Sequence, residues 1–144
     1  MPVSPSRENE QIASLPAKFI LFGEDDIDDE DLLREVIGGI DDSYHLLFVH
    51  NGRRLLEMLN EIPDNHLPCL IVLDYNMPEL NGAEILQEIR QVSRYSSVPK
   101  VIWSTSNSET FRRTCLEAGA NEYLIKPSNV ADLVNAAKYM LSLC

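Results

Sequence analysis

The stretch LIVLDYNMPELNG, residues 70–82, decides the fold. Four apolar residues run without a polar break into Asp74, a pattern typical of a central parallel strand that is buried on both faces. Asn81 and Gly82 then predict a turn, and residues 83–92 carry apolar side chains at helical spacing. The stretch therefore predicts one strand, a loop that begins at an acidic residue, and one helix.

Similar strand and helix patterns lie on both sides of this unit. The predicted strands are residues 18–23, 44–50, 69–74, 100–105 and 121–126, and the predicted helices are residues 28–37, 53–62, 83–92, 108–118 and 130–141. Gly38-Gly39 is expected to end the first helix. Because strands and helices alternate with no hairpin signal, the sequence predicts one α/β domain, with a parallel sheet and helices on both faces.

Composition sets further limits on the function. Of the 144 residues, 44% are apolar and 24% are charged, which is typical of a soluble globular domain. No apolar run approaches the roughly 18 residues of a membrane span, and the N-terminus lacks a secretory signal, so a cytoplasmic protein is expected. The net charge of −11 argues against nucleic acid as a partner. Residues 1–17, with three prolines and no periodicity, are predicted to be a flexible lead-in to a domain at 18–144.

The cysteines and histidines form no recognisable constellation. The three cysteines contain no CxxC pair, and their odd number suggests reduced thiols, with Cys69 and Cys115 in the core. The histidines are scattered and are interpreted as structural or surface residues: His45, His50 and His66.

The ends of the predicted strands carry the polar residues of interest. In open parallel sheets, ligands bind outside the carboxyl ends of the strands, where the strand order reverses. The polar residues at these ends are Glu24, Asp25 and Asp26 after the first strand, Asp74 after the third, Ser104 and Thr105 after the fourth, and Lys126 after the fifth. Carboxylates, hydroxyls and one amine are therefore expected to converge.

Such a cluster predicts phosphoryl-transfer chemistry. Two carboxylates about 4 Å apart repel by about 4 kcal/mol at an effective dielectric near 20, so the fold needs a cation to offset the cost. Magnesium takes one or two carboxylates together with waters and phosphate oxygens. Lys126 would add positive charge beside Asp74, which makes that carboxylate a plausible nucleophile toward phosphorus. Ser104 would hydrogen-bond a phosphoryl oxygen after the transfer.

Structural readings of the same residues stay open at this point. Acidic residues ahead of a helix often act as caps, and this reading is preferred for Asp26, Asp28 and Asp29. Glu24 and Asp25, taken alone, fit a cap as well as a ligand. Lys126-Pro127 alone would serve as a strand terminator in a tight turn, with a cis peptide bond as one option.

Four segments carry a resemblance to a known family. They are FILFGEDD (19–26), LIVLDYNMPELNG (70–82), VIWST (101–105) and YLIKP (123–127), and they include a D-x-x-M-P-x-x-x-G motif with a downstream Lys-Pro. This pattern resembles the receiver domain of bacterial two-component response regulators, of the stand-alone single-domain type, from about residue 18 to the end. The resemblance implies a flavodoxin-like (βα)5 doubly wound parallel sheet with strand order 2-1-3-4-5.

The resemblance also implies a role for each matching residue. Asp74 is similar to the phosphoacceptor, and Lys126 to the lysine that contacts the phosphoryl group. The implied Mg²⁺ ligands are Asp25, Asp74 and the backbone carbonyl of Asn76, with Glu24 acting through water. Ser104 matches the switch hydroxyl, with Thr105 as the alternative register. Tyr123 matches the switch aromatic residue, which reports phosphorylation on the face of the fourth helix, fifth strand and fifth helix.

Partners and reaction follow from the same resemblance. It implies Mg²⁺-dependent transfer from a phosphohistidine to Asp74, in a switch that takes part in its own modification and is not a turnover enzyme. The donor would be a sensor histidine kinase, of the phytochrome type by the similarity of the run 104–106, or a histidine phosphotransfer protein; a homodimer is a further option. Two alternatives remain: a phosphorylation-independent interaction module, and a haloacid-dehalogenase-type phosphatase. The latter needs an acid two residues after its nucleophile, where this chain has Asn76.

Overall fold

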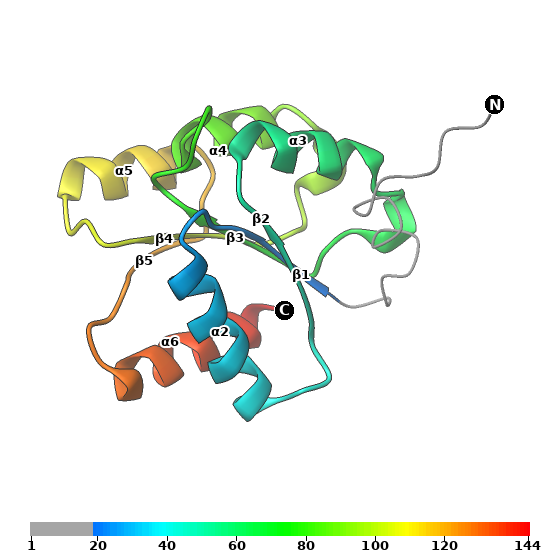
Figure 1. The fold of residues 1–144 in the computed structure, drawn as a ribbon. Helices are drawn as coiled ribbons and strands as arrows, with labels where there is room; N and C mark the ends of the chain where they lie inside the picture. The colour runs from blue at the N-terminus through cyan, green and yellow to red at the C-terminus, as the bar shows by residue number, and fades with distance from the viewer. Residues whose placement is uncertain (1–18) are drawn as a thin grey trace.

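The computed structural model describes residues 19–144, so the predicted lead-in at 1–17 lies outside the described residues (Figure 1). The strands are β1 (Phe19–Gly23), β2 (His45–Val49), β3 (Leu70–Asp74), β4 (Lys100–Ser104) and β5 (Glu122–Ile125). The α-helices are α2 (Ile27–Ile40), α3 (Gly52–Glu61), α4 (Gly82–Arg90), α5 (Glu109–Glu117) and α6 (Val130–Leu143), with short 3-10 turns at Asp64–His66 and Ser93–Tyr95. None of the helices described in residues 19–144 combines the length and apolarity that a membrane crossing requires.

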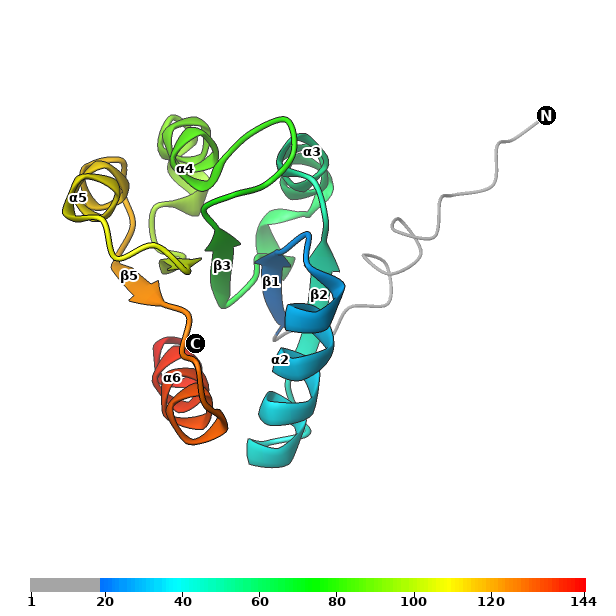
Figure 2. The ribbon, with the colours of Figure 1, turned by 60° about the vertical axis from the view of Figure 1, so that its left-hand side comes forward.

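The five strands form one parallel sheet in the order β2-β1-β3-β4-β5, which confirms the expected topology. Helices α2 and α6 cover one face of the sheet, and α3, α4 and α5 cover the other (Figures 1 and 2). Side chains alternate between the two layers along each strand. On β3, Ile71 and Leu73 pack under α3, α4 and α5, whereas Leu70 and Val72 pack against α2 and α6. Burial on both faces explains the unbroken apolar run before Asp74.

The first helix extends further than the sequence predicted. Gly38 and Gly39 lie inside the last turn of α2, which continues to Ile40 and ends at Asp41, whose N–H donates to the Ile37 carbonyl. Two helical glycines cost about 0.5–1 kcal/mol each relative to alanine. Ile37 is buried and Ile40 packs against the cluster between the sheet and α6, so burial of these side chains outweighs the cost. The predicted stop at Gly38-Gly39 is therefore wrong.

The motif glycine Gly82 allows α4 to begin directly against the end of β3. A Cβ atom at this position would lie 2.9 Å from Ile102 Cδ1 and 3.1 Å from the Asp74 carbonyl oxygen. The Gly82 N–H donates to the Tyr75 carbonyl at 2.9 Å, which closes the loop that follows Asp74. At the end of β5 the Lys126–Pro127 bond is trans, since residues 19–144 contain no cis peptide bond; the cis option is wrong.

The cysteines differ from expectation. Cys69, which precedes β3, forms a disulfide with Cys144, which follows α6; their Cα atoms are 4.8 Å apart. The expectation of reduced thiols is therefore wrong for this pair. Cys115 is a free, fully buried thiol, as expected, and burial raises its pKa to about 11. A thiol with so high a pKa is a core group and not a nucleophile.

Candidate functional site

The parallel sheet brings the predicted polar residues to one edge. Glu24 follows β1, Asp74 ends β3, Ser104 ends β4 and Lys126 follows β5, and these strands are neighbours in the sheet. Glu24 is 1% exposed, Asp74 6% and Ser104 0%, so polar groups are buried here at the end of an otherwise apolar layer. Their burial requires partners within the site.

Lys126 is the main partner of these carboxylates. Its Nζ atom donates hydrogen bonds to Asp74 Oδ2 at 2.9 Å and to Asp29 Oδ2 at 2.7 Å. Glu24 Oε2 lies 3.1 Å from the same nitrogen, but without hydrogen-bond alignment, so that buried oxygen has no hydrogen-bond partner. The Lys126 side chain is 11% exposed. Burial alone would lower its pKa, but the hydrogen bonds to Asp29 and Asp74 raise the pKa above its ordinary value.

Asp29 is a site residue that the sequence interpretation missed. The cap reading holds for Asp26, whose side chain accepts from the N–H groups of Asp28 and Asp29 at the start of α2. Asp29 lies in the same turn, but its carboxylate contacts Lys126 instead of capping the helix. The two residues are 97 positions apart in the chain, so no local sequence signal connects them.

Three carboxylates crowd together at this edge of the sheet. Glu24, Asp25 and Asp74 each offer an oxygen within 4.8 Å of the others. Burial, followed by the adjoining carboxylate of Asp74, raises the pKa of Glu24 to about 8. An all-oxygen donor set with mutual repulsion and one unpartnered buried oxygen fits a hard divalent cation such as Mg²⁺ or Mn²⁺. The acidic cluster could therefore hold a metal ion.

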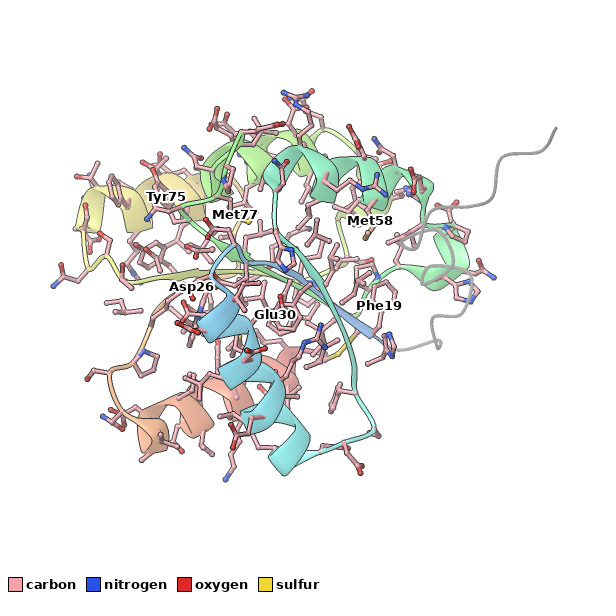
Figure 3. The ribbon with its side chains drawn as sticks, viewed as in Figure 1. Phe19, Asp26, Glu30, Met58, Tyr75 and Met77 are labelled. Carbon is pink, nitrogen blue, oxygen red and sulfur yellow. A yellow bond between two sulfur atoms is a disulfide. The ribbon has the colours of Figure 1, made fainter. Side chains whose placement is uncertain are left out.

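The loop after Asp74 is held against the site. The N–H of Asn76 donates to Asp74 Oδ1 at 3.0 Å, which orients the carboxylate. Tyr75 stacks on Phe111 of α5, with ring centroids 4.7 Å apart, and sequence reasoning did not anticipate this contact. In Figure 3, Tyr75 and Met77 lie on the side of the sheet that α3, α4 and α5 cover, and Asp26 lies on the α2 side. The carboxylate edge is thus flanked by both helical layers.

The residues after β4 connect the site to β5. The Ser104 hydroxyl is buried and accepts from the Ser106 N–H at 3.1 Å, whereas Thr105 is exposed in the loop. Tyr123, 7% exposed, donates its hydroxyl proton to the Ser106 carbonyl at 2.8 Å. The backbone of Ser106 therefore links the Ser104 hydroxyl to the Tyr123 hydroxyl.

The geometry combines a buried, oriented carboxylate with a lysine, a strand-end hydroxyl and acidic residues suited to a metal. The family model described as response regulator receiver domain matches residues 23–138, which include all of these groups. The chain belongs to the response regulator receiver domain family. The resemblance to receiver domains is thereby confirmed, and so is the function class: the chain is a receiver domain of two-component signalling.

Individual receiver domains show how closely this chain follows the family. The two-component response regulator ORR5 of Oryza sativa subsp. japonica is 37% identical over 109 residues, which cover 74% of this chain and 79% of ORR5. The Mn²⁺-bound form of response regulator Rcp1 is 30% identical, with a TM-score of 0.76 over 87% of this chain and 92% of Rcp1. The phosphorylated cyanobacterial phytochrome response regulator RcpA is 27% identical, with a TM-score of 0.78 over 88% of this chain and 96% of RcpA.

Proposed function

We propose that Asp74 is the phosphoacceptor of this receiver domain and that a histidine-phosphorylated protein is the donor. The observation that supports this most directly is the hydrogen bond from Lys126 Nζ to Asp74 Oδ2 at 2.9 Å, beside the acidic cluster of Glu24, Asp25 and Asp74. Lys126 and the Asn76 N–H fix the two Asp74 oxygens, so the carboxylate is presented in one orientation. Positioning of this kind is the main contribution of a protein to phosphoryl transfer.

The proposed step is an in-line displacement at phosphorus. An oxygen of Asp74 forms the new P–O bond while the P–N bond of phosphohistidine breaks, and the electron pair of that bond remains on the imidazole nitrogen. The other ring nitrogen keeps its proton, so a neutral imidazole leaves. A bound Mg²⁺, held by Asp25, Asp74 and the Asn76 carbonyl with Glu24 acting through water, would neutralise charge on the phosphoryl oxygens. Lys126 supplies the second positive charge.

The loop after β4 would then change conformation in response to the phosphoryl group. The acyl phosphate carries a charge of about −1.5 to −2 in place of the single charge of the carboxylate, and this extra charge attracts hydrogen-bond donors. Ser104 is our choice for the switch hydroxyl because it is buried at the strand end, whereas Thr105 faces solvent. Movement of the Ser104 hydroxyl toward a phosphoryl oxygen breaks its bond to the Ser106 N–H. Tyr123 follows, since its hydroxyl is bonded to the carbonyl of the same Ser106.

The donor protein is proposed to dock on the apolar residues that flank the site. Ile27 is 56% exposed, Leu32 39% and Val130 63%, and Leu32 and Val130 line a shallow pocket of about 120 Å³ together with Pro127. Ile27 and Leu32 lie in the first two turns of α2, Pro127 lies in the segment that joins β5 to α6, and Val130 is the first residue of α6. A sensor histidine kinase or a histidine phosphotransfer protein fits this role. The likeness to the phytochrome response regulator RcpA favours a phytochrome-type kinase. A cytoplasmic location is part of the same proposal.

The output is proposed to be a change of a binding face, not turnover of a substrate. Three exposed apolar residues mark that face: Phe111 of α5, Ile125 of β5 and Tyr139 of α6. Tyr123 connects them to the site because it lies on β5, two residues before Ile125. A downstream protein or a second copy of this chain would bind there when the loop after β4 moves.

Incubation with acetyl phosphate and Mg²⁺, followed by intact-mass analysis, tests the proposal. We expect the parent chain to gain one phosphoryl group as a slowly hydrolysing acyl phosphate, and the Asp74→Asn variant to gain none. A hydrolase would instead turn the donor over continuously, and a module that keeps only the fold would do neither. Equal labelling of parent and Asp74→Asn would overturn the acceptor assignment.

A further inference from the structure

Asp29 is the third carboxylate that contacts Lys126, and it is not needed to hold the lysine in the site. Asp74 and Glu24 lie 2.9 and 3.1 Å from Nζ, and both are almost fully buried. Asp29 comes from outside this pair, on the first turn of α2, and it makes the shortest of the three contacts at 2.7 Å. One ammonium group is therefore shared between the reacting carboxylate and a helix residue that belongs to neither the acceptor strand nor the acidic cluster.

We propose that Asp29 is a positioning residue: it acts through Lys126 and opposes phosphorylation of Asp74. This inference rests on the proposed function of Asp74 as phosphoacceptor. Asp29 holds the ammonium group against α2 and competes with the phosphoryl oxygens for it. Removal of the Asp29 charge is then expected to strengthen binding of a phosphoryl group or its analogue. Asp29 does not touch the reacting atoms, so this is a role in tuning and not in catalysis.

The charges of the site determine the direction of this effect. Among the described residues, Lys126 is the one lysine or arginine that contacts Glu24 and Asp74. Phosphorylation replaces the single negative charge of the Asp74 carboxylate with an acyl phosphate of about −1.5 to −2, so up to about one further negative charge lies beside Lys126. Asp29 then both repels the phosphoryl oxygens and retains one of the three ammonium hydrogens that they could accept. The neutral amide of asparagine removes the repulsion, and its carbonyl oxygen is a weaker acceptor for the ammonium hydrogen than a carboxylate is.

Asp29 is also held firmly enough to compete. Its backbone N–H donates to Asp26 Oδ1 at 3.2 Å, so the helix cap fixes its position. Its side chain is 33% exposed, which weakens the ion pair by solvent screening but does not abolish it. The ion pair also connects the phosphorylation site to the start of α2, next to the exposed Ile27 at which donor docking is proposed.

The probe for this inference is beryllofluoride, a phosphoryl analogue, at saturating Mg²⁺, with affinity measured by calorimetry and confirmed by the ¹⁹F spectrum of the bound form. We expect Asp29→Asn to bind beryllofluoride about three- to fivefold more tightly than the parent, the size of effect that one partly exposed ion pair carries. Asp29→Glu keeps the charge and is expected to remain closer to the parent. Asp29→Ser is a second neutral variant should the amide create a new contact.

Asp28→Asn is the matched control, because Asp28 lies in the same turn of α2, carries the same charge and is exposed. It is expected to change the affinity by less than twofold. The inference is overturned if Asp29→Asn binds as the parent does or more weakly, or if Asp28→Asn gains as much. A parent chain that binds no beryllofluoride would overturn the proposed function itself, and this inference with it, so the two failures are distinguishable.

Discussion

Substitution of Glu24 by glutamine tests the electrostatics of the acidic cluster. Without divalent cations, we expect the stability of the parent chain to fall as pH rises from about 5 to 8, and the stability of Glu24→Gln to change much less. The cause is the buried carboxyl of Glu24, which must ionise beside Asp74 as the pH rises. The amide of glutamine cannot ionise.

The magnitude follows from the pKa of Glu24, raised from 4.5 to about 8, first by burial and then by the neighbouring Asp74. The folded chain holds this proton more tightly than the unfolded chain does. The stabilisation is therefore complete below pH 4.5 and is lost as pH rises through 8. Within that window the unfolding free energy falls by at most about 1.4 kcal/mol per pH unit. For a chain of 144 residues, this corresponds to a Tm decrease of about 4 °C per unit.

The assay is thermal unfolding followed by circular dichroism between pH 5 and 8 in a chelator, repeated in saturating Mg²⁺. Mg²⁺ should flatten the parent profile, since a cation that holds ionised Glu24 lowers the pKa of that group in the folded chain. Glu35→Gln is the matched control, because Glu35 is exposed on α2 and should leave the slope of the parent unchanged. Parallel profiles for the parent and Glu24→Gln in the chelator would refute the reasoning.

Three further perturbations have expected outcomes in unfolding experiments. Lys126→Met leaves the buried carboxylates of Glu24 and Asp74 without their cation. The substitution should lower the unfolding free energy by about 3 kcal/mol in a chelator and by less in Mg²⁺. An equal loss of unfolding free energy in the two buffers would contradict this expectation. Gly82→Ala should destabilise the fold by about 1–3 kcal/mol because the added Cβ meets Ile102 and the backbone. Gly38→Ala, at an exposed position of α2 where the added Cβ meets no neighbouring element, should stabilise the fold by up to about 1 kcal/mol. Equal effects of the two substitutions would contradict the packing argument. Reduction of the Cys69–Cys144 disulfide, or Cys144→Ser, should lower stability by about 2–4 kcal/mol, and a thiol count of three in the oxidised protein would contradict the pairing.

The elements of the fold could be predicted because their signals are local. The apolar run into Asp74 reflects burial of β3 on both faces, and the helical spacing in 83–92 reflects one buried face of α4. Strand-end polar residues could be placed together from the parallel topology alone, since every carboxyl end meets the same edge. Glu24, Asp74, Ser104 and Lys126 do lie there.

The remaining features depend on contacts between distant parts of the chain. The ion pair between Asp29 and Lys126 joins residues 97 positions apart, and the disulfide between Cys69 and Cys144 joins residues 75 apart. The helical conformation of Gly38 and Gly39 depends on burial of Ile37 and Ile40 beside α6, which outweighs the local preference for a stop. Neither the ion pair nor the disulfide leaves a pattern in the neighbouring sequence.

The central claim is that Asp74, held by Lys126 and the acidic cluster, receives the phosphoryl group. Borohydride reduction of the chain after treatment with acetyl phosphate and Mg²⁺, followed by peptide mass analysis, converts a phosphorylated aspartate to homoserine and so locates it. We predict homoserine at position 74 and at no other aspartate. Homoserine at Asp25 or Asp29, with position 74 unmodified, would contradict the account.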